Sequence, residues 1–182
     1  MATFIMLPDG TTQSQWDASG GGSANYTDVD NDNGDTQYAF SNTNGERMIF
    51  TLEAPSVADG DIDTINTVTI KASAAKTLSG SGRMTFQQTG TAADSSIISN
   101  GSDTILVMSG GIYATYSGTA ETTSDGTNTW VYGDLAGLSI RVTKFRNDRY
   151  GEIRVSYLYA EVDYTASVVA VTDNATFFGA NF

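Results

Sequence analysis

Short stretches in which apolar and polar residues alternate recur along most of the chain. In one of them, Met48, Phe50 and Leu52 alternate with Ile49, Thr51 and Glu53. A period of two is typical of a β-strand with one buried face. Similar stretches lie around residues 4–7, 67–72, 83–88, 105–108, 113–116, 140–143 and 152–164. The pattern predicts roughly eight to ten short strands with a turn signal about every ten residues, as in a β-sandwich or jelly roll.

The stretch 152–164 is the longest of these and is apolar at both odd and even positions. The odd positions carry Ile153, Val155, Tyr157 and Tyr159, and the even positions carry Leu158, Ala160, Val162 and Tyr164. A strand that is apolar on both sides is typical of a sheet that is covered on both faces. The pattern therefore predicts a central strand with two buried faces.

The segments between the alternating stretches set the domain organisation. Residues 9–36 are rich in Gly, Asp and Asn and predict a long polar loop, which Trp16 and Tyr26 anchor to the core. The resulting fold class is all-β, a single antiparallel β-sandwich of jelly-roll-like form over residues 1–165, with a closed barrel as the main alternative. Residues 166–182 form a C-terminal extension, with one more strand around 168–171 and a Phe-rich arm.

The negative net charge of the chain disfavours polyanionic partners. The 182-residue chain has a formal net charge of −12, and 40% of its residues are hydrophobic, which is enough for a core. Residues 1–63 hold eleven of the acidic residues and a single basic one, Arg47. A surface this acidic repels polyanions. We therefore expect no nucleic acid and no membrane among the partners.

The chain has neither Cys nor His. It therefore lacks thiolate ligands, disulfides, the commonest general base and the commonest ligand of transition metals. The carboxylate pairs Asp61 with Asp63 and Glu161 with Asp163 have a spacing that a glycosidase allows, but solvated acids are the simpler interpretation. The composition predicts a protein that is not an enzyme and has no organic cofactor.

A run of alternating acids is the one candidate for a metal site. Asp28, Asp30 and Asp32 are spaced so that their oxygens can converge on a hard cation such as Ca²⁺. The run departs from the EF-hand pattern, because Gly34 stands one place late and Ala39 occupies the twelfth position. A cluster of solvated turn residues is the alternative interpretation.

Two stretches in the second half of the chain resemble a known family. They are 127–142, with Trp130 followed by Asp134-Leu135, and 152–164, which ends in Tyr159-Ala-Glu-Val-Asp-Tyr164. Together with Trp16 and the Asn/Asp/Gly-rich segment after it, they resemble jelly-roll-like β-sandwich domains of tailed-bacteriophage structural proteins, over about residues 10–165. The resemblance implies a virion part, made in the host cytoplasm, of a kind that is often an oligomer and commonly a trimer.

Two features outside that resemblance are candidates for contact with partner proteins. Five of the nine basic residues fall within 141–154, and the contact residues we expect among them are Arg141, Lys144, Arg146 and Arg149. Arg suits acidic partners because it forms bidentate bonds with carboxylates. Phe177, Phe178 and Phe182 are the second feature, since exposed aromatic residues favour docking on a neighbouring surface. The alternatives are an ordinary charged hairpin and an arm that packs on its own core.

These features yield two main functional hypotheses, and a carbohydrate-active enzyme of jelly-roll type is a third that lacks a convincing carboxylate pair. The first is a head decoration protein that binds the major capsid protein or other virion proteins and stabilises the assembled shell. The alternative is a domain of a tail fibre or other appendage that binds glycans. The aromatic residues expected to stack on sugars are Tyr113, Tyr116, Trp130, Tyr132 and Tyr150.

The first hypothesis predicts that reversing charge in the basic cluster weakens assembly. Replacing both Arg146 and Arg149 with Glu removes two bidentate donors and places like charges against an acidic neighbour. Cosedimentation of the variant with capsids at physiological salt measures the effect. Binding equal to that of the unaltered protein would reject the cluster as a contact surface.

Overall fold

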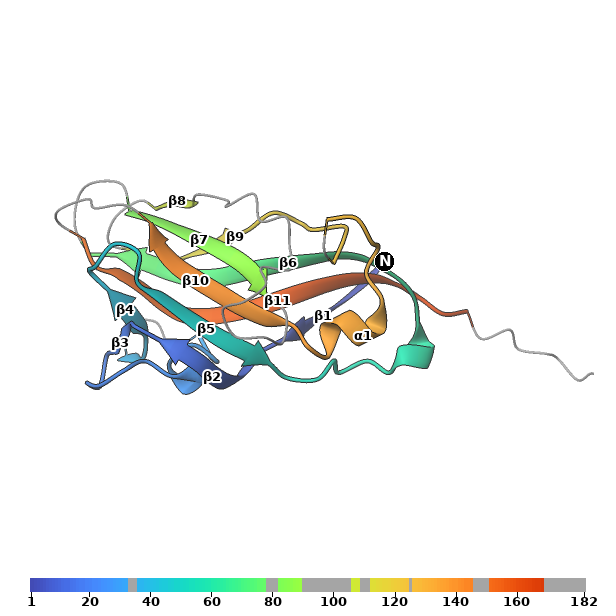
Figure 1. Cartoon of the computed structure of the whole chain (residues 1–182), viewed down its shortest axis with the longest axis horizontal. Helices are drawn as coiled ribbons and strands as arrows, with labels where there is room; N and C mark the ends of the chain where they lie inside the picture. The colour runs from blue at the N-terminus through green and yellow to red at the C-terminus, as the bar shows by residue number, and fades with distance from the viewer. Residues whose placement is uncertain are drawn as a thin grey trace, which may run out of the picture.

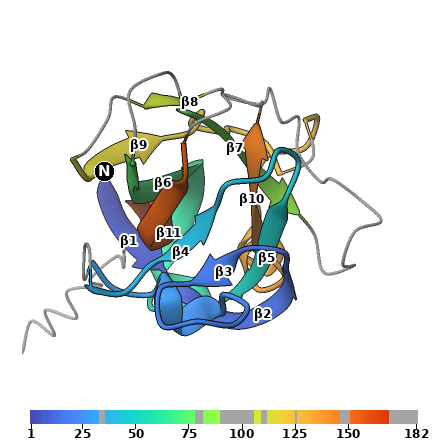
Figure 2. The ribbon, with the colours of Figure 1, turned by 90° about the vertical axis from the view of Figure 1, so that its left-hand side faces the viewer.

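The computed structural model describes residues 1–32, 36–77, 82–89, 106–108, 112–124, 126–145 and 151–168, with the backbone alone for 82–89, 106–108 and 145. Within these residues the strands form two sheets in which every pair is antiparallel. Figure 2 shows the two layers end-on. The prediction of an antiparallel β-sandwich is therefore confirmed.

The first sheet, called sheet A, has the strand order β3-β4-β11-β6-β9, and β1 also pairs with β11. Its strands are β1 (Ala2–Met6), β3 (Asp17–Ala18), β4 (Ala39–Ser41), β6 (Ile62–Lys76), β9 (Ala114–Ser117) and β11 (Ile153–Ala166). Most neighbours are distant in sequence, as in Greek-key and jelly-roll sandwiches. Sheet A is therefore held together by long-range pairing.

The second sheet, sheet B, has the order β2-β5-β10-β7-β8. Its strands are β2 (Pro8–Ser14), β5 (Arg47–Leu52), β7 (Gly82–Thr89), β8 (Leu106–Met108) and β10 (Ser139–Phe145). Short helical turns within the described residues accompany the sheets, among them η1 (Tyr26–Asp28), η3 (Asp59–Asp61) and α1 (Tyr132–Leu135). Figure 1 places η3 and α1 at one end of the sandwich and β3 and β4 toward the other.

The core lies between the two sheets and is built from the inward positions of the alternating strands. Sheet A contributes Val68, Ile70, Ala72, Leu158, Ala160 and Val162, and sheet B contributes Met48, Phe50, Leu52, Ile140 and Val142. Burial of this apolar surface supplies the main driving force for folding. The alternation seen in the sequence thus becomes one continuous core.

A β-bulge in β11 explains why both odd and even positions are apolar. The register with β6 shifts between Val155 and Tyr157, so that Ser156 is the extra residue. Ile153 and Val155 are buried before the bulge, and Leu158, Ala160 and Val162 are buried after it. A bulge of one residue moves the inward face from odd to even positions. β11 is central, but the expectation of two buried faces is wrong, because Tyr157 and Tyr159 are half-buried on the outer face.

The expectation of a long polar loop over residues 9–36 is also wrong in part. β2 occupies Pro8–Ser14 and pairs with β5, and η1 follows at Tyr26–Asp28. β2 tolerates a polar sequence because most of its side chains are not buried. A Cβ atom on Gly10 would lie 2.6 Å from the Thr51 hydroxyl oxygen, so this edge strand needs glycine there. The anchoring role of Trp16 is confirmed: the indole is buried and its Nε1 donates to the Glu46 carbonyl.

Most of the expected C-terminal extension, residues 166–182, lies outside the described residues. β11 continues to Ala166, and the Ser167 amide donates to the Asp61 carbonyl beside η3. Val168 is exposed and lies outside a strand. Residues 169–182, with the Phe-rich arm, lie outside the described residues. In the described part of the chain, no helix is long and apolar enough to cross a membrane.

The register of β11 predicts a sharp contrast between neighbouring positions. Leu158 is fully buried opposite Ala72, so Leu158→Ala removes core volume and lowers the free energy of unfolding by about 2–5 kcal/mol. Glu161 faces outward and pairs with Lys71, so Glu161→Ala costs less than about 1 kcal/mol. Denaturant unfolding measures both variants. Equal losses for the two substitutions would contradict the bulge-defined register.

Candidate functional site

The outer face of sheet A carries two pairs of aromatic side chains. In β4, Ala39 and Ser41 are buried toward the core, so Tyr38 and Phe40 face outward, with their ring centroids 6.0 Å apart. On β11, the ring centroids of Tyr157 and Tyr159 lie 4.8 Å apart. All four rings are half-buried. We call these four side chains the aromatic face.

Arg154 joins β11 to the pair formed by Tyr38 and Phe40. It lies opposite Phe40 in the register between β4 and β11, and its guanidinium carbon is 4.5 Å from the Tyr38 ring centroid. Its Nε donates to Glu152 Oε1 at 2.6 Å. A guanidinium over an aromatic ring is held by a cation–π interaction. The two aromatic pairs thus lie along the same strand, with Arg154 at the β4 end and Tyr157 and Tyr159 farther along β11.

Two carboxylates flank the tyrosine pair on β11. The Asp32 Oδ1 accepts from the Ser156 hydroxyl at 3.4 Å, and the Glu53 Oε1 accepts from the Leu7 amide at 3.1 Å. Burial raises the pKa of Tyr157 above its ordinary value, and Tyr159, Asp32 and Glu53 add to the rise by opposing a second negative charge. Asp32 and Glu53 thus act electrostatically on the Tyr157 hydroxyl, although they come from different segments of the chain.

The segment before Asp32 is built against the same strand. The Leu158 amide donates to the Val29 carbonyl at 2.8 Å, and Asp30 forms an isolated bridge with Tyr157. This segment therefore follows β11 beside the bulge. It brings the Asp32 carboxylate to Ser156, next to Tyr157.

Farther along β11, the acids of the outer face are engaged by neighbours. The Lys71 ammonium donates to Glu161 Oε1 at 2.6 Å, and the Asn66 side chain donates to Asp163 Oδ1 at 3.1 Å. Both acids thus accept hydrogen bonds from side chains of the neighbouring strand β6.

The three aspartates of the expected calcium site have separate roles. Asp28 is buried, and its Oδ2 accepts from the Asn25 amide in the capping box of η1. Asp30 accepts from the Asn31 side chain, and Asp32 accepts from Ser156. Among the described residues, no three acidic side chains gather into a group that can hold a metal ion. The structure therefore does not bring Asp28, Asp30 and Asp32 together as ligands.

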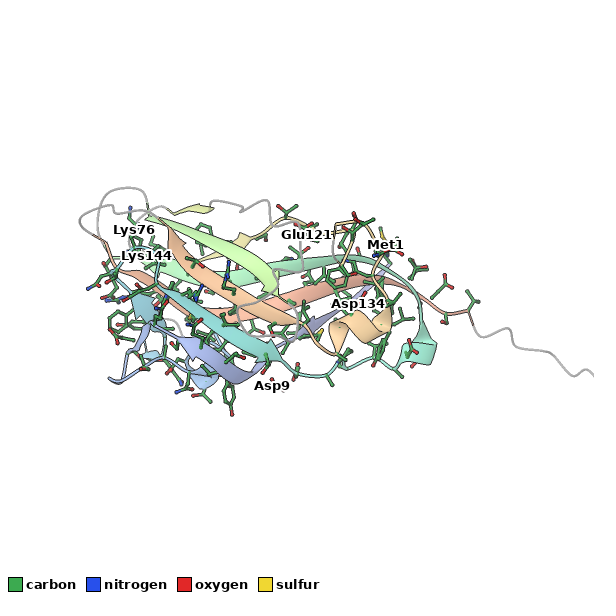
Figure 3. The ribbon with its side chains drawn as sticks, in the orientation of Figure 1. Met1, Asp9, Lys76, Glu121, Asp134 and Lys144 are labelled. Atoms are coloured by element: carbon green, nitrogen blue, oxygen red, sulfur yellow. The ribbon has the colours of Figure 1, made fainter. Side chains whose placement is uncertain are left out.

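The basic cluster does not lie on one surface. Arg141 is half-buried on β10 in sheet B, whereas Lys144 shares the inward face of that strand with Ile140 and Val142 and is 3% exposed. The expectation that Lys144 contacts a partner is therefore wrong, because strand alternation points it into the sandwich. Figure 3 shows Lys144 and the buried Lys76 at one end, away from Asp134 on α1. Arg146, Arg149, Phe177, Phe178 and Phe182 lie outside the described residues.

A pocket of about 380 Å³ lies at the end of the sandwich that carries α1 and η3. Its lining includes Asp59, Asp63, Trp130 and Tyr132, two of which were expected to stack on sugars. The indole of Trp130 is only 5% exposed and donates to the Glu121 carbonyl, and the Tyr132 hydroxyl donates to the Val57 carbonyl. Both side chains are thus bound to the backbone of this domain through their polar groups.

The other aromatic residues expected at a glycan site do not join them. Tyr116 on β9 is partly buried against the core, and Tyr113 precedes β9. Tyr150 lies outside the described residues. The aromatic face on sheet A was missed in the sequence because Tyr157 and Tyr159 were expected to be covered. The signal that was available was the switch of the apolar positions from odd to even around Ser156.

Comparisons with known proteins return a likeness among solved structures. No family model matches the sequence, and no curated protein matches it. Among solved structures, the chain is similar to the CBM36-1 domain of a multidomain xylanase from the hindgut metagenome of Trinervitermes trinervoides. The identity is 10%, with 92% of this chain and 100% of that chain covered and a TM-score of 0.46. The likeness is limited to the arrangement of the strands.

The raised pKa of Tyr157 predicts a loss of stability at alkaline pH. Tyr157 ionises near pH 10 in the unfolded chain and only at higher pH in the folded chain. The stability that the neutral phenol contributes is therefore fully present below about pH 10 and is lost as the pH rises through the folded-state pKa. Tyr157→Phe lacks this contribution, so its stability falls less above about pH 10. Unfolding at a series of pH values and the absorbance of phenolate measure the effect. The prediction fails if the phenolate signal that Tyr157→Phe removes has a midpoint at or below the ordinary tyrosine value.

Proposed function

We propose that this chain is a non-catalytic glycan-binding domain and that the aromatic face of sheet A is its ligand surface. The observation that carries the proposal is the pair of outward tyrosines on β11, whose rings lie 4.8 Å apart beside the carboxylates of Asp32 and Glu53. Sugar rings present C–H faces that pack on aromatic rings and hydroxyl groups that donate to carboxylates. The site offers both partners within one surface.

The scaffold holds these groups in place before a ligand arrives. Tyr157 and Tyr159 belong to a strand that pairs with β6 on one side and with β1 and β4 on the other. Asp32 and Glu53 are each oriented by a hydrogen bond from the protein. Sites on regular elements lose less conformational entropy on binding than sites on free loops. A weak ligand such as a sugar benefits most from this arrangement.

The length of the face favours a chain of sugars over a single one. Because Ser156 is bulged, the strand from Arg154 to Tyr159 advances past four residues of β6, or roughly 13 Å at about 3.3 Å per residue. Tyr38 and Phe40 extend the surface at the Arg154 end. An oligosaccharide lying along β11 therefore meets both aromatic pairs. We propose an extended glycan as the ligand.

The virion setting comes from the resemblance of the sequence to phage structural domains. Within it, we propose a tail-fibre or other appendage domain in preference to head decoration. The aromatic face supports that choice, because binding to host-surface glycans is a task of an appendage. Head decoration stays a prediction that rests on the resemblance and on the Phe-rich arm, and the burial of Lys144 removes one of its expected contact residues.

Removal of either tyrosine ring is expected to weaken glycan binding. Tyr157→Ala and Tyr159→Ala each delete a stacking surface, and we expect each to weaken binding at least about tenfold, which is about 1.4 kcal/mol. A glycan array identifies the ligand, and titration calorimetry with the best array member measures the loss. Tyr157→Phe keeps the ring and is expected to retain most of the affinity.

Tyr132→Ala is the matched control. Tyr132 is half-buried like Tyr157 but lies beside the pocket at the α1 end. Circular dichroism confirms that each variant is folded. Binding that survives in Tyr157→Ala and Tyr159→Ala but is lost in Tyr132→Ala would place the site in that pocket and overturn the proposal for sheet A.

A further inference from the structure

Carboxylates dominate the charge around the tyrosine pair. Asp32 and Glu53, from two segments outside β11, oppose a negative charge on Tyr157, and Asp30 meets Tyr157 in a backbone bridge. The cations of this face are neutralised by partners of their own: Lys71 is bound to Glu161 and Arg154 to Glu152, both at 2.6 Å. The surface next to the rings is therefore anionic.

The flanking carboxylates keep acceptor capacity for a ligand. A carboxylate has about four acceptor positions on its two oxygens. Asp32 accepts from Ser156 through Oδ1, and Glu53 accepts from Leu7 through Oε1. Asp32 is exposed, and Glu53 is half-buried. Both can accept further hydrogen bonds from hydroxyl or ammonium groups on a sugar that is stacked on the rings.

We infer that this face selects glycans by charge, and the inference rests on the proposed function. The ligand is a neutral or amino-bearing glycan, and uronic acids and other acidic sugars are excluded. Asp32 and Glu53 are the specificity-determining residues. A ligand carboxylate at this position meets like charge, and the described cations of this face, Lys71 and Arg154, already have carboxylate partners. Discrimination of this kind is achieved by repulsion of the wrong ligand as much as by attraction of the right one.

Local charge and overall charge make different predictions. Two unit charges a few ångströms apart in water interact by about 1 kcal/mol, or roughly a fivefold change in affinity, and salt screens charges that lie beyond about 8 Å. The net charge of −12 also repels anions, but from all parts of the surface. If Asp32 and Glu53 repel an acidic ligand locally, removing their charges must therefore change the affinity for that ligand more than removing equal charges elsewhere.

A glycan array that carries the same linkage as neutral sugar, amino sugar and uronic acid tests the inference. We expect the unaltered protein to bind the neutral and amino forms and to bind the uronic acid form at least about tenfold more weakly at low salt. The double variant Asp32→Asn with Glu53→Gln keeps the accepting oxygens and removes both charges. We expect it to gain about tenfold for the uronic acid form relative to the neutral form.

The double variant Asp59→Asn with Asp61→Asn is the matched control. Both residues are exposed at η3, at the end of the sandwich away from β4, and their substitution changes the net charge equally. The inference is overturned if the uronic acid form binds the unaltered protein as tightly as the neutral form. It is also overturned if the control variant gains as much as the Asp32 and Glu53 variant. Binding to none of the three forms would instead reject the proposed function, and the inference with it.

Discussion

The antiparallel pairing of β11 with β6 is the constraint on which the rest of the structure depends. The ladder joins Ile153–Ala166 to Ile62–Lys76 over nearly the whole length of both strands. Its inward side chains form one wall of the core. Its other edge, along β11, receives β1, β4 and the segment around Val29. If this ladder slipped by one residue, the core side chains of the slipped strand would turn outward.

The bulge at Ser156 decides which side chains of β11 face outward. Ser156 is buried at the point where two residues of β11 oppose one of β6. Its hydroxyl oxygen lies 3.5 Å from the carbonyl oxygen of Ser73 on β6. The extra residue lets Leu158 continue the core that Val155 began, and it turns Tyr157 and Tyr159 outward together. Without the bulge, either the apolar side chains before Ser156 or those after it would point away from the core. The aromatic face is therefore a consequence of how the core is packed.

Strand alternation also decides the fate of the basic residues. Lys76 and Lys144 stand at the ends of β6 and β10, on the inward faces of opposite sheets, and both are buried at the same end of the sandwich (Figure 3). Their ammonium nitrogens are buried as well. A basic cluster that is compact in sequence is thus divided by the pleat. Only the inward or outward phase of each strand shows which of these charges can meet a partner.

The sequence by itself determined the fold class and the positions of most strands, because alternation with a period of two is a local property. The stretch around Met48, Phe50 and Leu52 and the stretch around Ile140 and Val142 became β5 and β10 as expected. Only the tertiary structure decided what depends on strands that pair across long distances. It placed polar β2 in what was predicted to be a loop, buried Lys144, and assigned Asp28 to a helix cap. It also gathered Asp32, Glu53 and the β11 tyrosines from three distant segments, since register and bulges are set by the partner strand and by core packing.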